Sequence, residues 1–142
     1  MKTQVFSLLV NNNTGLLSRV AGLFSRRGYN IDSITSGTTM NKSLTLITVV
    51  ATGDTQVLSQ IEKQLAKLED VVDIKILEDG KSVCRELIMV KIKANAAQRA
   101  EVISVADIFR AKIVDVETES LMLEMTGNRS KVEAFLNLLS GY

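Results

Sequence analysis

No histidine, proline or tryptophan occurs among the 142 residues, and cysteine occurs once, as Cys84. The absence of histidine excludes catalytic triads of the Ser-His-Asp and Cys-His types, and it excludes an imidazole general base near neutral pH. Zinc sites that need histidine or four cysteines cannot be assembled from one such chain. A single cysteine allows no intrachain disulfide, so the sequence favours a reducing compartment, and we expect a cytoplasmic protein.

An excess of charge of one sign is also missing. The chain carries 17 Lys and Arg residues against 16 Asp and Glu residues, a net charge of +1. Nucleic acids and anionic membranes are bound by clustered Lys and Arg, so we expect neither as a partner. No apolar run approaches the roughly 20 residues of a membrane-spanning helix. The apolar run at residues 5–10 has no small-residue cleavage site after it, and we expect no signal peptide.

What is present in the first half is a regular alternation of strand and helix patterns. Runs rich in β-branched residues predict strands near residues 5–10, 31–39, 44–50 and 71–77. Apolar residues at helical spacing predict one helix between Thr14, as its N-cap, and Gly28, and a second helix after Asp54. The order is strand, helix, strand, strand, helix, strand, which is the ferredoxin-like βαββαβ unit.

The same pattern restarts after the polar stretch at residues 78–82. Thr126–Gly127–Asn128 repeats Thr52–Gly53–Asp54, in which a strand leads through Thr-Gly into an Asp or Asn N-cap. We therefore predict an α+β protein with two ferredoxin-like βαββαβ units in tandem, at residues 1–78 and 79–142, the second lacking its last strand. In such a unit both helices lie on one face of an antiparallel sheet, and the open face and open edge favour a homodimer or a higher oligomer. The alternative is a monomer whose two halves cover each other.

The turn between the first strand and the first helix is the most informative stretch. The backbone N–H groups of Gly15, Leu16 and Leu17 open the helix, where they lack acceptors within the helix and lie at the positive end of its dipole. Such an end suits a carboxylate or a phosphate, and glycine lets a ligand approach the backbone closely. The side-chain amides of Asn12 and Asn13 can both donate and accept. The stretch thus suits a small ligand with an anionic end and a second polar group, although turns with an N-cap often have the same composition.

Other candidate sites are less specific. Tyr29 and Asn30 stand where the second strand begins, a place typical of core packing and of turn chemistry. Cys84 has no histidine to activate it, which favours a structural or bystander thiol. An acylphosphatase-like hydrolase would need an arginine-bearing phosphate loop before the first helix, where this chain is rich in asparagine. An RNA-recognition module would need exposed aromatic residues on its central strands and a basic surface.

Residues 9–33 resemble the N-terminal block of the small, regulatory subunit of acetolactate synthase, also called acetohydroxyacid synthase. A second resemblance lies at residues 85–87 and 108–116, followed by Ser120, Glu124, Thr126 and Gly127. Together these blocks extend the similarity over essentially the whole chain. The resemblance implies an amino-acid-sensing ACT domain at residues 1–78 and the truncated C-terminal ferredoxin-like domain of that subunit at residues 79–142.

The resemblance also implies a function in branched-chain amino acid biosynthesis. Subunits of this family have no catalytic centre, associate with a large catalytic subunit, raise its activity and commonly make it sensitive to valine. Thiamine diphosphate, magnesium and FAD belong to that large subunit, so no cofactor or metal is expected in this chain. The alternative is a stand-alone ACT-type amino-acid-binding regulator of another enzyme.

The family's valine site matches the turn described above. By resemblance, Asn12 and Gly15, with the amides of Leu16 and Leu17, would hold the polar end of valine. Asn30 would come from the neighbouring protomer, so that the site lies at an interface between two ACT domains. The apolar side chain of the ligand would meet Ile31 and Leu16.

Overall fold

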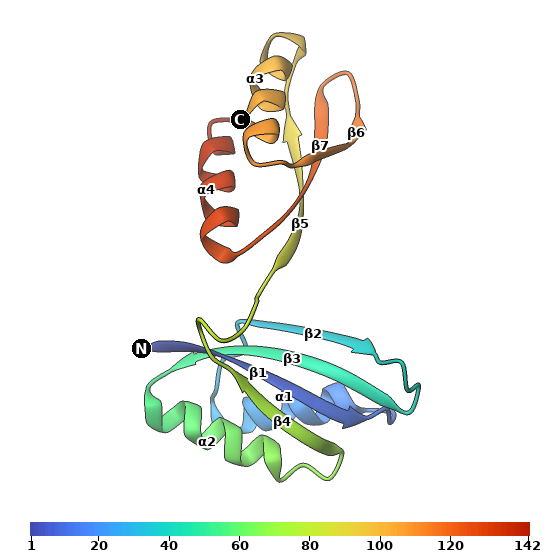
Figure 1. Ribbon diagram of the computed structural model, residues 1–142, viewed down its shortest axis with the longest axis vertical. Helices are drawn as coiled ribbons and strands as arrows, with labels where there is room; N and C mark the ends of the chain where they lie inside the picture. The colour runs from blue at the N-terminus through green and yellow to red at the C-terminus, as the bar shows by residue number, and fades with distance from the viewer. The chain divides into compact units, whose positions relative to one another are not determined.

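The computed structural model describes residues 1–142, which divide into two compact units, Met1–Ser82 and Val83–Tyr142. The first unit contains β1 (Lys2–Asn11), α1 (Leu16–Arg27), β2 (Ser33–Thr38), β3 (Leu44–Gly53), α2 (Thr55–Ala66) and β4 (Val71–Leu77). The second contains β5 (Glu86–Lys93), α3 (Ala96–Ile108), β6 (Lys112–Val116), β7 (Ser120–Gly127) and α4 (Arg129–Leu139) (Figure 1). The predicted α+β class, with two ferredoxin-like units of which the second lacks a strand, is confirmed.

The first unit is an antiparallel sheet of order β2-β3-β1-β4 with α1 and α2 on one face (Figure 1). Strand β1 is central, but its apolar run is not buried on both sides. Phe6, Leu8 and Val10 face the helices and are fully buried, whereas Val5 and Leu9 on the other face are half-buried. The core is completed from the helices and from β3 by Leu16, Val20, Leu23, Phe24, Ile47, Val49, Ala51, Leu58, Ile61 and Leu65. Both helices cover the same face, so no helix of this unit covers the opposite face of the sheet.

The start of α1 differs from the sequence prediction. Its N-cap is Gly15 rather than Thr14, and no side chain caps the helix. Gly15 has a left-handed backbone with φ of +79°, a conformation that costs other residues roughly 1–2 kcal/mol. The chain therefore turns into the helix through a glycine backbone rather than through a threonine hydroxyl. At the other end, the helix ends at Gly28 as predicted, where the backbone is left-handed and the N–H donates to the Ser25 carbonyl.

A corner made of a strand end, a glycine and a helix N-cap occurs once in each unit. The carboxylate of Asp54 accepts from the Val57 N–H at 2.8 Å, and the amide oxygen of Asn128 accepts from the Lys131 N–H at 3.0 Å. The glycine before each cap packs closely on the following helix, since an added Cβ would lie 2.9 Å from a Val57 carbon at residue 53 and 2.7 Å from Lys131 at residue 127. The predicted sequence repeat is thus a structural repeat.

The second unit is a sheet of order β5-β7-β6, with a register shift in β6, and α3 and α4 pack against it. Its separate core consists of Ile92, Ala94, Val102, Ala106, Leu121, Leu123, Met125, Val132, Phe135 and Leu139. The rings of Phe109 and Phe135 lie 5.3 Å apart between their centroids. The chain contains no helix with both the length and the apolar character needed to cross a membrane.

Candidate functional site

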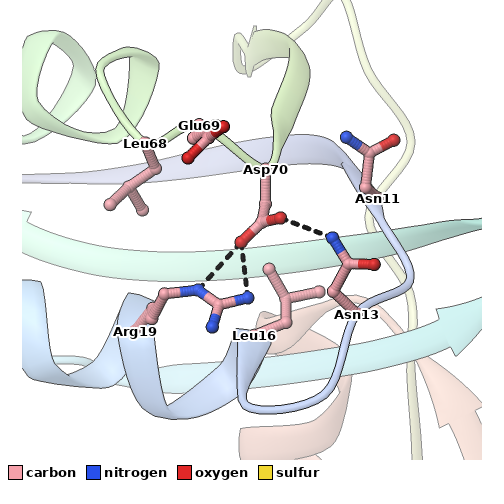
Figure 2. Close-up of a pocket in the computed structure, with 7 residues that line it drawn as sticks. All are labelled: Asn11, Asn13, Leu16, Arg19, Leu68, Glu69 and Asp70. Carbon is pink, nitrogen blue, oxygen red and sulfur yellow. Dashed lines mark hydrogen bonds and ion pairs between the residues drawn. The ribbon is translucent and has the colours of Figure 1, made fainter.

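The turn between β1 and α1 is fixed by Asp70, which precedes β4 (Figure 2). One carboxylate oxygen of Asp70 accepts from Asn13 Nδ2 at 2.7 Å, and the other accepts from Arg19 Nε at 2.8 Å. A second guanidinium nitrogen of Arg19 lies 2.6 Å from the same carboxylate oxygen. The Asn11 N–H donates to the Asp70 carbonyl at 2.8 Å. The turn is therefore connected to both α1 and the start of β4.

Asn13, Arg19 and Asp70, here called the Asp70 cluster, therefore hold the turn in place. The hydrogen bond from Asn13, followed by that from Arg19, lowers the pKa of the Asp70 carboxyl below its ordinary value of 3.8. The cluster borders a cleft of about 410 Å³ lined by Asn11, Asn13, Leu16, Arg19, Leu68, Glu69 and Asp70. Arg19 and Asp70 are already paired with each other, and the Asn13 amide nitrogen, which the sequence offered as a ligand group, donates to Asp70 instead.

A second cleft, of about 500 Å³, opens at the start of α1 beside the ends of β2 and β3. It is lined by Asn12, Asn13, Gly15, Leu16, Leu17, Ser18, Ser36, Gly37, Thr38 and Thr45. Its volume falls within the range of about 300–1,000 Å³ that is usual for small-molecule sites. The structure thus brings Asn12, Gly15, Leu16 and Leu17 of the predicted site together in one cleft. We call it the α1 cleft.

The backbone of the α1 cleft offers hydrogen-bond donors. The N–H groups of Gly15, Leu17 and Ser18 have no acceptor within the protein. The Leu16 N–H departs from our expectation, because it donates to the Asn13 carbonyl at 3.3 Å. The left-handed backbone of Gly15 folds the turn back far enough for that carbonyl to reach it. Three N–H groups at the positive end of the α1 dipole remain for a ligand.

Asn12 supplies an acceptor at the same place. Its Nδ2 donates to the Lys42 carbonyl at 3.2 Å, and its backbone N–H donates to the Ser43 carbonyl at 2.9 Å. Both contacts hold Asn12 against the hairpin between β2 and β3, while its side-chain oxygen accepts no hydrogen bond. The α1 cleft therefore combines donors that suit a carboxylate with an acceptor that suits an ammonium group.

Sequence reasoning missed the four hydroxyl residues of this cleft, Ser18, Ser36, Thr38 and Thr45. Thr45 is 5% exposed, and its hydroxyl is buried without a hydrogen-bond partner. The sequence did contain a signal for it. Thr45 stands in register with Ile47 and Val49 on the buried face of β3, where a hydroxyl is out of place among apolar side chains.

Asn30 and Ile31 lie at the opposite end of α1 from the cleft. Helix α1 has 12 residues, which at 1.5 Å per residue make about 18 Å. Asn30 follows its C-terminal end and donates from Nδ2 to the Asp32 carboxylate at 2.7 Å. Ile31 is half-buried against the core of the first unit. A single chain therefore does not bring Asn30 or Ile31 to the α1 cleft.

Comparison with known proteins gives consistent matches along the chain. The family profile described as "AHAS small subunit-like ACT domain" matches residues 6–73, and the one described as "Small subunit of acetolactate synthase" matches residues 85–142. The acetolactate synthase small subunit of Mycobacterium avium is 47% identical over 138 residues, which are 97% of this chain and 83% of the relative. The probable acetolactate synthase small subunit of Methanothermobacter thermautotrophicus is 46% identical over 141 residues, 99% of this chain and 84% of the relative.

Solved structures agree with these matches. The crystal structure of the acetolactate synthase small subunit from Thermotoga maritima is similar with a TM-score of 0.89 at 40% identity, over 98% of this chain and 87% of that chain. The regulatory subunit of aspartate kinase from Thermus thermophilus has a TM-score of 0.50 at 14% identity, over 98% of this chain and 91% of that chain. The second likeness is one of fold alone.

Proposed function

Because this chain belongs to the family of acetolactate synthase small subunits, we propose that it binds valine between two copies of its first unit and thereby regulates a catalytic subunit. The observation that carries the proposal is the polarity of the α1 cleft. Unpaired N–H groups at the start of α1 suit the carboxylate of an α-amino acid, and the side-chain oxygen of Asn12 suits its ammonium group. Leu16 lines the same cleft and offers an apolar contact for the valine side chain.

The second copy is needed because the cleft is incomplete in one chain. Strand β2 forms an edge of the first sheet, and all its residues are exposed. Its backbone is thus free to pair with the same strand of another copy. A twofold pairing of this kind is antiparallel, so the residues before Ser33 of one copy approach the residues around Thr38 of the other.

This pairing direction explains the position of Asn30 and Ile31. Both residues directly precede β2, whereas Ser36 and Thr38 at the other end of β2 line the α1 cleft. In an antiparallel β2–β2 pair, Asn30 and Ile31 of one protomer lie beside the cleft of its partner. The exposed side chains of Leu17 and Ile34, which are 48% and 39% accessible, give this edge an apolar component.

The proposed partner is the large catalytic subunit of acetolactate synthase, in the synthesis of branched-chain amino acids. Thiamine diphosphate, magnesium and FAD would belong to that subunit, as membership of this family implies. Association would raise the activity of the catalytic subunit, and valine would lower it. Valine can act only through different affinities for two arrangements of the assembly, typically worth about 1–3 kcal/mol.

Isothermal titration of the chain with valine tests binding, with leucine and isoleucine as comparisons. We expect saturable heat for valine, and no heat at millimolar valine would overturn the proposal. Adding the chain to the catalytic subunit then tests regulation, through acetolactate formation with and without valine. Binding of valine without any effect on that activity would instead favour a stand-alone amino-acid-binding regulator of another enzyme.

Mixing two variants tests the shared site. Asn12→Ala and Asn30→Ala should each lose valine binding as homodimers, because every site then lacks one of the two asparagines. In a mixed dimer one site lacks both residues while the other is intact. An equimolar mixture, exchanged to equilibrium, should therefore regain binding at one site per mixed dimer. No recovery in verified mixed dimers would show that Asn12 and Asn30 do not act across the interface.

A further inference from the structure

The hydroxyl of Thr45 is the one hydroxyl in the chain that is buried without a hydrogen-bond partner. The only other buried and unpartnered side-chain atom is Arg99 Nε, whose guanidinium already donates to the carbonyls of Glu117 and Thr118. Buried polar groups are nearly always paired, because an unpaired group loses its hydration without compensation. Thr45 therefore needs an explanation that Arg99 does not.

The position of Thr45 supplies one. In the sheet it stands between Thr38 of β2 and Val10 of β1, at the end of β3 that borders the α1 cleft. Leu17 and Ser18, whose N–H groups are unpaired, line the same cleft. Thr45 of β3 and these two residues of α1 thus line one cavity, and the Thr45 hydroxyl itself is buried beside it. Rotation about the Cα–Cβ bond of Thr45 turns its hydroxyl between staggered positions without moving the strand.

We infer that the Thr45 hydroxyl donates a hydrogen bond to the carboxylate of the amino acid bound in the α1 cleft. The inference rests on the proposed function and adds to it a contact between the ligand and strand β3. One carboxylate oxygen accepts hydrogen bonds from the N–H groups of Leu17 and Ser18, and the other accepts one from the Thr45 hydroxyl. The carboxylate is the partner because the positive end of the α1 dipole draws the anionic group to this side, while Asn12 offers an acceptor to the ammonium group.

The test compares variants of the full chain by valine titration and thermal unfolding. Thr45→Val keeps the shape of the side chain and removes only the hydroxyl, and we expect its affinity for valine to fall about tenfold or more. Without valine it should be at least as stable as the unchanged protein, because it loses an unpaired buried group. Thr45→Ser should keep most of the affinity, because it keeps the hydroxyl. Thr48→Val is the matched control, on the other face of the same strand and opposite Ser7 and Thr35.

Isobutylamine, which is valine without its carboxyl group, identifies the end of the ligand that is contacted. It offers no oxygen to the Thr45 hydroxyl, so Thr45→Val should change its binding no more than Thr48→Val does. Valine affinity that is unchanged in Thr45→Val, while the unchanged protein binds valine, would overturn this inference and leave the proposed function in place. A fall in stability of Thr45→Val without valine would also overturn it, because the hydroxyl would then have a partner inside the protein. Absence of valine binding by the unchanged protein would overturn the proposed function first.

Discussion

Replacing Gly15 and Gly28 by alanine, one at a time, separates backbone strain from ligand contact. The two glycines cap opposite ends of α1 and have similar left-handed φ angles of +79° and +68°. Only Gly15 lines the α1 cleft. A Cβ at residue 15 would meet its nearest neighbour, Arg19 Nη1, at an ordinary contact distance of 3.4 Å, and a Cβ at residue 28 would meet nothing within 4 Å. Neither alanine therefore clashes with the folded protein.

The expected loss of stability is nearly the same for both variants. A left-handed backbone costs a non-glycine residue roughly 1–2 kcal/mol, and the lower entropy of the unfolded chain returns roughly 0.4–1 kcal/mol. The net cost is about 1 kcal/mol in each case. For a domain of about 60–100 residues, such as the unit Met1–Ser82, this lowers the melting temperature by about 4–8 °C. Differential scanning calorimetry measures the shift.

Valine affinity should respond to only one of the two changes. Gly15→Ala adds a methyl group at a residue that lines the α1 cleft, next to the unpaired N–H groups of the helix start, and we expect affinity to fall at least about tenfold. Gly28→Ala should bind valine within about twofold of the unchanged protein. Equal losses of affinity would mean that strain in α1, rather than contact at residue 15, controls binding. An unchanged melting temperature in both variants would refute the left-handed caps.

Three further predictions concern stability. Asp54→Ala should lower the free energy of unfolding by about 1 kcal/mol in urea titrations, because the Val57 N–H loses its acceptor, whereas Asp54→Asn should keep most of it; equal losses would refute the cap. Because the pKa of Asp70 is lowered from 3.8, its carboxylate contributes stability in full above that pH, and the contribution is lost as the pH falls through the lowered value. The difference in melting temperature between the protein and Asp70→Asn should therefore shrink in acid, and a constant difference would contradict this reasoning. Phe135→Ala, at the centre of the second core, should cost about 3–5 kcal/mol and lower the transition of the second unit in calorimetry while valine affinity stays unchanged; loss of valine binding would contradict separate cores.

Most of the fold could be predicted from the sequence because its elements follow local rules. The strand predicted at residues 71–77 coincides with β4, and the N-caps predicted at Asp54 and Asn128 are present. The spacing of apolar residues and the preferences of helix caps depend on a few neighbouring residues, so both can be read from the sequence. The prediction of Thr14 as N-cap was wrong. Threonine and glycine both occur at N-caps, and only the backbone angles of Gly15 show which of the two residues caps α1.

The candidate site could be predicted only in part, because it depends on residues that are distant in the sequence. The turn itself pointed to Asn12, Gly15 and Leu17, whose groups come from one continuous segment. The role of Asn13 depended on Asp70, which is 57 residues away in the chain, and no local pattern relates the two. The alternation of β3 signals that Thr45 is out of place among apolar residues, but only the structure shows that its hydroxyl is buried and unpaired beside the cleft.

The two strand–glycine–cap corners have a consequence for protein engineering. Their caps have almost the same backbone angles, with φ of −75° and ψ of 171° at Asp54 and φ of −76° and ψ of 170° at Asn128. The two corners therefore have the same backbone geometry. We expect that the tripeptides Thr52–Gly53–Asp54 and Thr126–Gly127–Asn128 can be exchanged without redesigning either core. The cap position of this corner accepts either aspartate or asparagine, whereas the position before it requires glycine because the following helix packs closely against it.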